Sequence, residues 1–334
     1  MRQAVPEEEG KGTVENTNDE PAIVAEGLRK SYAGGPHGEV EAVRGLDLTI
    51  ERGQLFGLLG PNGAGKSTTI GMLTTMVRPT GGRARVCGVD VAADPVAVKR
   101  RIGVVAQQDG LDIELNAEEN LEFRARYFGM TGRDARRRGA RLLEFFGLAD
   151  RRRARPFELS GGQAKRLMIA RALVHRPDVL FLDEPTAALD PQSRINLWNV
   201  LRELQSAGQT IVLTTHYMEE AEALCERLAV IDRGEVLAND TVKALQATAG
   251  AETVVTVAFE GGPLDVDRLR ARPGVGRVEA HDRQVRVFAR DAEGLMGEVL
   301  ALATAAGAVI TDAAQLRPSL ETVFLTLTGR EYRE

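Results

Sequence analysis

Cysteine, surplus positive charge and long apolar runs are all scarce in this 334-residue sequence. The two cysteines, Cys87 and Cys225, lie far apart, which excludes a disulfide framework and a four-cysteine zinc site and indicates a reducing compartment. Lysine and arginine total 43 against 48 aspartates and glutamates, so the formal net charge is -5. That balance excludes a strongly basic protein that binds nucleic acid through its overall charge.

No stretch is long enough to cross a bilayer as a helix, which takes about 20 mostly apolar residues. The longest apolar candidate, Val299 to Ile310, is shorter than that. Residues 1–20 carry Arg2 and Lys11 against six acidic residues and lack the apolar centre of a secretory signal peptide, so they are predicted to form a disordered acidic tail. We therefore expect the chain in the cytoplasm unless a partner holds it at a membrane.

The composition is that of a soluble globular chain with a large core, with 43% hydrophobic and 27% charged residues. At roughly 150 residues per domain, the length predicts two domains. From residue 21 to 245, apolar strand patterns alternate with helical patterns, which is typical of an α/β domain. The clearest strands are apolar on both faces, as in a buried parallel sheet, and are Leu55 to Leu59, Val179 to Leu182 and Ile211 to Thr214.

Residues 112–158 interrupt this alternation and are predicted to form a mostly helical insertion, with helices over Glu118 to Phe128 and Asp134 to Phe146. Between Arg133 and Arg155 there are nine arginines and three acidic residues. The simpler interpretation is a helical face turned to water, because charge runs usually face solvent. The alternative is a surface that contacts a membrane partner or lipid headgroups.

Residues 246–334 are predicted to form a small α+β accessory domain. Thr253 to Phe259 alternates like a half-buried strand, and Val278 to Ala280 with Val285 to Phe288 indicates a hairpin. Helical patterns cover Leu264 to Arg270 and Ala292 to Ala305. No cluster of catalytic residue types occurs there.

The strongest functional motif is a glycine-rich segment that follows the strand Leu55 to Leu59 and matches the phosphate-loop pattern G-x-x-x-x-G-K-[ST] at every fixed position. Its glycines let backbone N–H groups turn toward phosphate oxygens, and a helix N-terminus adds partial positive charge. Lys66 is expected to neutralise the β and γ phosphates, and Ser67 to bind Mg²⁺. The predicted nucleotide-binding segment consists of Gly60, Pro61, Asn62, Gly63, Ala64, Gly65, Lys66, Ser67 and Thr68.

Two carboxylates end the second apolar strand, at Asp183 and Glu184. A carboxylate at a strand tip can hold Mg²⁺ directly or through water, which we expect of Asp183. Glu184 is placed to orient the attacking water or accept its proton. After a phosphate loop, such a strand end becomes strong evidence for nucleotide hydrolysis.

A third motif follows Leu159 and precedes a helical pattern. A serine and two glycines before a helix can bind an oxyanion, although an ordinary N-cap explains the serine equally well when the motif is considered alone. The residues of this motif are Ser160, Gly161, Gly162 and Gln163.

Together and in this order, these motifs resemble those of the ATP-binding cassette (ABC) family of transporter ATPases, over about residues 22–245. The resemblance implies a phosphate-loop NTPase fold with a helical subdomain. It also implies roles for four further residues. Tyr32 would stack on adenine, Gln107 would contact Mg²⁺ and sense the membrane partner, Asp190 would line the dimer interface, and His216 would contact the γ phosphate. Because Gln108 follows, the register at Gln107 is ambiguous by one residue.

The resemblance also implies cofactors and partners. ATP and Mg²⁺ would bind between two copies of the chain in a head-to-tail homodimer, with Lys66, Glu184 and His216 as catalytic residues. Separate integral-membrane permease subunits would hold the dimer at the cytoplasmic face of a bacterial membrane, with no nucleic acid bound. Arg317 to Phe324 and the preceding domain resemble exporters of the daunorubicin-resistance type, whose relatives export antibiotics, lipids, polysaccharides or sodium.

Other ATPases share the motifs. DNA-repair and chromosome ATPases place a long coiled coil between phosphate loop and signature, yet Lys66 and Ser160 are only 94 positions apart without sustained heptads. Translation-associated ATPases normally carry two cassettes in one chain, and one is present here. A regulatory module that only binds nucleotide is disfavoured because Lys66, Asp183, Glu184 and His216 are all intact.

Overall fold

The computed structural model describes most of the chain, in eight segments: residues 20–34, 38–106, 110–248, 253–261, 264–281, 283–290, 292–316 and 319–328. The predicted acidic tail, apart from Glu20, lies outside the described residues. The chain divides into two compact units between Asn239 and Asp240, inside strand β10 (Glu235–Thr241). The predicted division into domains at residues 245 and 246 stays a prediction.

A six-stranded sheet forms the centre of the first unit, in the order β10-β9-β3-β8-β7-β6. The pairs β3–β8, β3–β9, β7–β8 and β6–β7 are parallel. The three strands expected from their apolar runs are confirmed, because side chains apolar on both faces are buried on both faces. The bounds are β3 Leu55–Leu59, β6 Ile102–Val105, β7 Val179–Asp183, β8 Thr210–Thr215 and β9 Arg227–Asp232.

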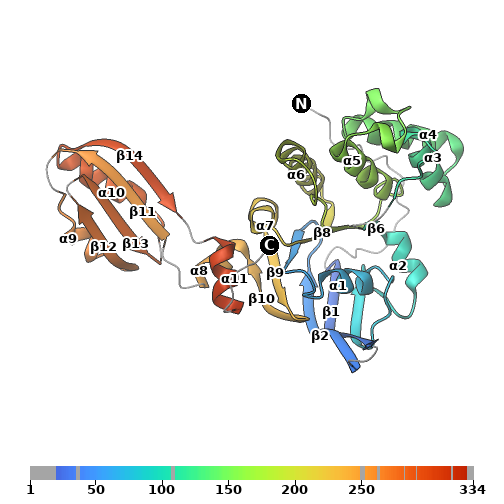
Figure 1. The fold of residues 1–334 in the computed structure, drawn as a ribbon, viewed down its shortest axis with the longest axis horizontal. Coiled ribbons are helices and arrows are strands. Elements are labelled where there is room, and N and C mark those ends of the chain that lie inside the picture. The colour runs from blue at the N-terminus through green and yellow to red at the C-terminus, as the bar shows by residue number, and fades with distance from the viewer. Residues whose placement is uncertain are drawn as a thin grey trace. The chain divides into compact units, whose positions relative to one another are not determined.

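A second, antiparallel sheet packs beside the central one, in the order β2-β1-β4-β5 (Figure 1). Its apolar side chains, among them Ile23 and Leu46, share one core with Phe56, Phe181 and Ile70 of the central strands and helix α1. The phosphate loop between β3 and α1 therefore starts from a rigid, fully buried strand. The bounds are β1 Ile23–Gly34, β2 Gly38–Ile50, β4 Gly81–Val86, β5 Val89–Asp90, α1 Lys66–Leu73, α2 Pro95–Arg101, α6 Pro191–Ser206 and α7 Met218–Leu224.

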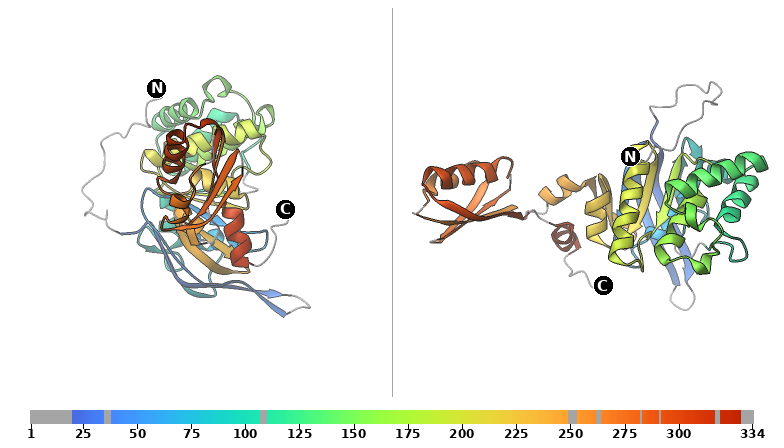
Figure 2. Two further views of the ribbon diagram at one scale, coloured as in Figure 1. Left: turned by 90° about the vertical axis from the view of Figure 1, so that its left-hand side faces the viewer. Right: turned by 90° about the horizontal axis from the view of Figure 1, so that it is seen from above.

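The helical insertion is confirmed as helices α3 (Ala117–Tyr127) and α4 (Gly132–Phe145), which contact each other and α5 (Gly161–Ala172). The views agree that these three helices lie side by side, away from β1 and β2 (Figures 1 and 2). Two short 3-10 helices, η1 (Ala149–Arg151) and η2 (Pro156–Glu158), lead into α5.

Most arginines of the 133–155 run are exposed in the single chain, as both interpretations of this run predict. Arg138 differs, because its guanidinium donates to the carbonyls of Leu173 (3.0 Å) and Val174 (3.3 Å). Burial and neighbouring arginines lower the pKa of Arg138 to about 10.

The second unit contains an antiparallel sheet in the order β12-β13-β11-β14, with α10 (Leu295–Ala305) packed against β11 and β14. The predicted hairpin is confirmed by the β12–β13 pairing. Helix α9 (Asp267–Arg270) is shorter than predicted, and strand β14 (Val309–Leu316) was not anticipated. The remaining bounds are β11 Thr253–Glu260, β12 Val275–His281, β13 Gln284–Ala289, α8 Val242–Thr248 and α11 Leu320–Thr328.

Two helices of this unit flank its sheet in the chain, with α8 before β11 and α11 after β14. They contact each other and bury Leu245, Leu320 and Phe324. Residues 317 and 318 of the C-terminal motif lie outside the described part of the chain. Within that part, no helix combines the length and apolarity needed to cross a bilayer.

Candidate functional site

The phosphate loop runs from the end of β3 to the first turn of α1, and its glycines are required by the backbone. Gly63 and Gly65 have φ of 79° and 104°, in the left-handed region that favours glycine. A Cβ on Gly65 would lie 2.5 Å from the carbonyl oxygen of Ala42, and one on Gly60 would lie 2.1 Å from that of Ile231. Neighbouring backbone thus leaves no room for side chains at either end of the loop.

Lys66 lies beneath this loop and is almost fully buried, with 4% of its surface exposed. Its ammonium donates to the carbonyl oxygens of Gly60 (2.6 Å) and Pro61 (3.0 Å) and lies 3.9 Å from Glu184 Oε1. Burial lowers the pKa of Lys66, and the charges of Glu184 and Asp183 oppose that shift. The loop therefore already holds the positive charge that a phosphate group would need.

Oxygen atoms gather next to this lysine. Ser67 Oγ donates to Asp183 Oδ1 at 3.2 Å, and Thr214 Oγ1 donates to the same atom at 2.5 Å. Mg²⁺ prefers such carboxylate and hydroxyl oxygens, so Ser67 and Asp183 fit the ion. Among the described residues, no group of three or more histidine, cysteine or acidic side chains is placed to hold a metal ion.

Glu184 and His216 meet at the carboxyl ends of adjacent strands. Glu184 Oε1 lies 3.1 Å from His216 Nδ1, and their side chains are 13% and 20% exposed. Glu184 has φ of 47°, so the chain turns sharply as β7 ends. The structure thus brings together Lys66, Ser67, Asp183, Glu184 and His216, which sequence reasoning had placed at one site. Thr214 was missed, because no motif marks it and its contacts arise from the pairing of β7 with β8.

The serine-glycine motif starts helix α5 and forms a capping box. Ser160 Oγ accepts from the backbone N–H of Gln163 (3.3 Å), and Gln163 Oε1 accepts from that of Ser160 (3.0 Å). The N-cap interpretation is therefore correct as a structural statement, and Ser160 is exposed for a second role.

This motif is packed against the segment that contains Asp190. A Cβ on Gly162 would lie 2.6 Å from Ser193 Oγ, and the atom nearest to one on Gly161 is Leu189 Cδ2, at 3.8 Å. Asp190 caps α6 by accepting from the backbone N–H of Ser193 (2.9 Å), and hydrogen bonds from Ser193 lower the pKa of Asp190. Ser160, Gly161, Gly162 and Asp190 thus form a second group of predicted residues.

Two further predicted residues lie outside both groups. Tyr32, near the end of β1, is 41% exposed, and Lys30 Nζ lies 4.8 Å from its ring centroid. The Lys30 ammonium lies over one face of the ring, and the role of Tyr32 in stacking on adenine stays a prediction. Gln107 lies outside the described residues.

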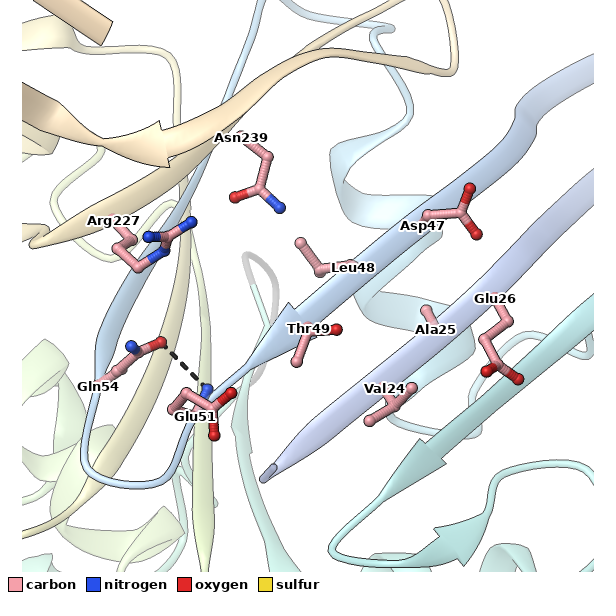
Figure 3. Close-up of a pocket in the computed structure, with 10 residues that line it drawn as sticks. All are labelled: Val24, Ala25, Glu26, Asp47, Leu48, Thr49, Glu51, Gln54, Arg227 and Asn239. Carbon is pink, nitrogen blue, oxygen red and sulfur yellow. Dashed lines mark hydrogen bonds between the residues drawn. The ribbon is translucent and has the colours of Figure 1, made fainter. Parts of the chain in front are cut away.

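A separate pocket of about 530 Å³ opens between β1, β2 and β9. Figure 3 shows the residues that line it, and Gln54 Oε1 accepts from the backbone N–H of Glu51 at 3.1 Å. None of the predicted site residues lines it, so the pocket is distinct from the phosphate loop. Its lining residues are Val24, Ala25, Glu26, Asp47, Leu48, Thr49, Glu51, Gln54, Arg227 and Asn239.

Comparisons with known proteins show what the chain is similar to. The sequence model of the family described as ABC transporter matches residues 43–187. Nod factor export ATP-binding protein I from Ralstonia nicotianae is 43% identical over 94% of this chain and 96% of its own length. The daunorubicin resistance ATP-binding protein DrrA3 from Streptomyces coeruleorubidus is 41% identical over 93% of this chain and 97% of its own.

Solved structures agree as well. The dimeric structure of an ATP-binding cassette in a post-hydrolysis state, bound to ADP and Pi, aligns with a TM-score of 0.61 and 29% identity. That alignment covers 66% of this chain and 98% of the solved one.

Proposed function

The chain belongs to the family of ATP-binding subunits of ABC transporters, and from that premise we propose that two copies bind ATP head to tail and power export through separate membrane subunits. It is an ATPase, and its hydrolysis of ATP is coupled to transport. The observation that carries the proposal is the convergence of Lys66, Asp183, Glu184 and His216 on the phosphate loop.

The first step is nucleotide binding by the loop between β3 and α1. The N–H groups of the loop and the N-terminus of α1 face the phosphates. Lys66 replaces its hydrogen bonds to the carbonyl oxygens of Gly60 and Pro61 with hydrogen bonds to phosphate oxygens. Ser67 and Asp183 would hold Mg²⁺, which supplies charge neutralisation at the phosphates. The exposed ring of Tyr32 would stack on the adenine.

Hydrolysis then depends on Glu184 and His216. The Glu184 carboxylate orients the attacking water and accepts its proton. His216, in contact with that carboxylate, is positioned to donate to the terminal phosphate. Both groups are mostly shielded from solvent, which strengthens their electrostatic effect on the reaction.

A second copy completes the site in this proposal. Ser160 to Gln163 start a helix whose N-terminus suits an oxyanion, and they sit with Asp190 in a group apart from the phosphate loop. A two-fold dimer would bring this group of one copy to the loop of the other. The dimeric state of the solved cassette supports that arrangement.

Export of a drug is the transport activity we propose. It is supported by relatives named for daunorubicin resistance and Nod factor export, which align along nearly their full length. Lipid, polysaccharide or sodium export is the alternative. The permease would hold the dimer at the cytoplasmic face of a bacterial membrane, through the helical insertion and the segment around Gln107.

Co-purification tests this proposal. The chain is expressed with membrane proteins encoded beside its gene, and the detergent-solubilised complex is assayed for ATP hydrolysis with and without Mg²⁺. We expect a stable complex whose hydrolysis needs Mg²⁺ and whose presence in cells lowers accumulation of a fluorescent anthracycline. Absence of any associated membrane protein would refute the transport role. An active complex that does not reduce drug accumulation would show that the cargo belongs to another chemical class.

A further inference from the structure

Thr214 connects the two acidic residues at the end of β7, and the proposed mechanism gives it no role. It lies directly opposite Asp183 in the parallel pairing of β7 and β8. Its hydroxyl donates to Asp183 Oδ1 at 2.5 Å and accepts from the backbone N–H of Glu184 at 3.0 Å. A hydroxyl has one proton to donate, and Thr214 uses it on the carboxylate while a lone pair receives the Glu184 N–H.

The hydrogen bond that Thr214 accepts matters because Glu184 has an unusual backbone conformation. Its φ of 47° lies in the left-handed region, which is unfavourable for a residue with a long side chain. The β7–β8 pairing ends at Asp183, and the next N–H, that of Glu184, donates to the Thr214 hydroxyl. This bond stabilises the turn that leaves Glu184 Oε1 facing His216 Nδ1.

The donated bond fixes the neighbouring carboxylate. Asp183 Oδ1 receives both Thr214 Oγ1 and Ser67 Oγ, which restrains the carboxylate between β8 and the first turn of α1. Thr214 itself is fully buried, so no water competes for its hydroxyl in this arrangement. A single side chain on the adjacent strand therefore restrains the Asp183 carboxylate and the Glu184 backbone.

We propose that Thr214 is a positioning residue for ATP hydrolysis. Its hydroxyl holds the Asp183 carboxylate and the Glu184 backbone in fixed positions beside the phosphate loop. The inference rests on the hydrolytic roles proposed for Asp183 and Glu184. On this inference, the Thr214 hydroxyl affects the rate of turnover and the Mg²⁺ requirement. Its effect on ATP affinity is small, because Thr214 touches neither the loop backbone nor Lys66 in the contacts described above.

The test compares Thr214→Val, which keeps the shape but removes the hydroxyl, with Thr214→Ser, which keeps the hydroxyl. Thr210→Val is the matched control. Thr210 lies at the opposite end of the same strand, is 2% exposed, and accepts from the backbone N–H of Gly53 at 2.9 Å. Steady-state ATP hydrolysis gives kcat and KM for each variant, together with the half-saturating Mg²⁺ concentration.

For Thr214→Val we expect kcat to fall about 10-fold or more, KM for ATP to change less than about 3-fold, and the Mg²⁺ requirement to rise. Thr214→Ser should recover most of kcat, and Thr210→Val should match the wild type. ATP-dependent dimerisation of Thr214→Val should persist. Equal kcat for Thr214→Val and Thr210→Val would overturn the inference, and so would a loss of kcat that serine does not restore.

Thermal unfolding of each variant checks that it folds. If Thr214→Val does not fold, Thr214→Ala takes its place against Thr214→Ser, under the same expectations and the same contrary results. A wild-type chain that hydrolyses no ATP would instead contradict the proposed function, so the two failures are distinguishable.

Discussion

Glu184 Oε1 and His216 Nδ1 lie 3.1 Å apart, although the residues are 32 positions apart and follow two different strands. Parallel pairing of β7 and β8 brings both strand ends to the same edge of the sheet. The contact gives the carboxylate a defined direction beside Lys66, where we propose that the terminal phosphate of ATP binds.

Replacing Glu184 by glutamine should slow hydrolysis by about 100-fold or more, because the amide cannot accept the proton of the attacking water. ATP binding should be retained, and the variant should accumulate as an ATP-bound dimer in size-exclusion chromatography with light scattering. Glu219→Gln, at an exposed position at the start of α7, is the control and should behave as wild type. Wild-type turnover by Glu184→Gln would show that another group activates the water.

Replacing Lys66 by alanine should weaken ATP binding at least about 10-fold, because the buried ammonium is the positive charge under the loop. Equilibrium titration with a fluorescent ATP analogue measures the affinity. Lys99→Ala, on the exposed side of α2, removes the same charge far from the loop in sequence and should leave the affinity unchanged. Equal affinities for the two variants would contradict the role of Lys66.

Replacing Ser160 by alanine in the Glu184→Gln background should reduce the fraction of dimer at saturating ATP while the monomer still binds nucleotide. Loss of an N-cap also costs about 1 kcal/mol of stability, so the control must lose a cap as well. Thr131→Ala supplies it, since Thr131 Oγ1 accepts from the N–H of Asp134 at the start of α4. If both variants dimerise equally, Ser160 acts only as a cap.

His175 should make stability fall in acid. Its ring stacks on Phe128 at 3.8 Å and its Nε2 donates to the carbonyl of Ile102 at 2.9 Å, while Nδ1 has no partner among the described residues. Burial lowers its pKa to about 4, with Arg124 and Arg138 acting in the same direction. The unfolded chain therefore binds the proton first, and stability decreases as the pH falls from about 6.5 toward 4.

Urea unfolding at pH 7 and pH 5 measures this effect, and partial exposure of the ring reduces it to on the order of 1–2 kcal/mol. His175→Asn should be less stable at pH 7 but lose part of the pH dependence, because the amide can still donate to the Ile102 carbonyl and does not titrate. An unchanged difference between the two pH values in His175→Asn would place the acid sensitivity elsewhere.

Elements with strong local signals were predicted correctly from the sequence. The strand Leu55 to Leu59 was found with its observed bounds because all five of its residues are buried, and the loop after it was found because φ above zero demands glycine at fixed positions. Strand β14 was missed because its side chains, from Val309 to Leu316, are nearly all exposed and carry no alternation. Packing along β11 orders that strand instead.

The site followed the same division. Sequence motifs identify Lys66, Asp183 and Glu184. The contacts of Thr214 depend instead on the register of β7 against β8, two strands separated by helix α6 in the chain. No local pattern encodes that register, because long-range pairing is set by the packing of the whole sheet.

Helices α5 and α6 touch at Gly162 and Ser193 with no space for even one methyl group. Closely packed contacts of this kind transmit displacement instead of absorbing it. We therefore expect the helix capped by Ser160 and the helix capped by Asp190 to move together. In that case a displacement of one N-cap would be accompanied by a displacement of the other.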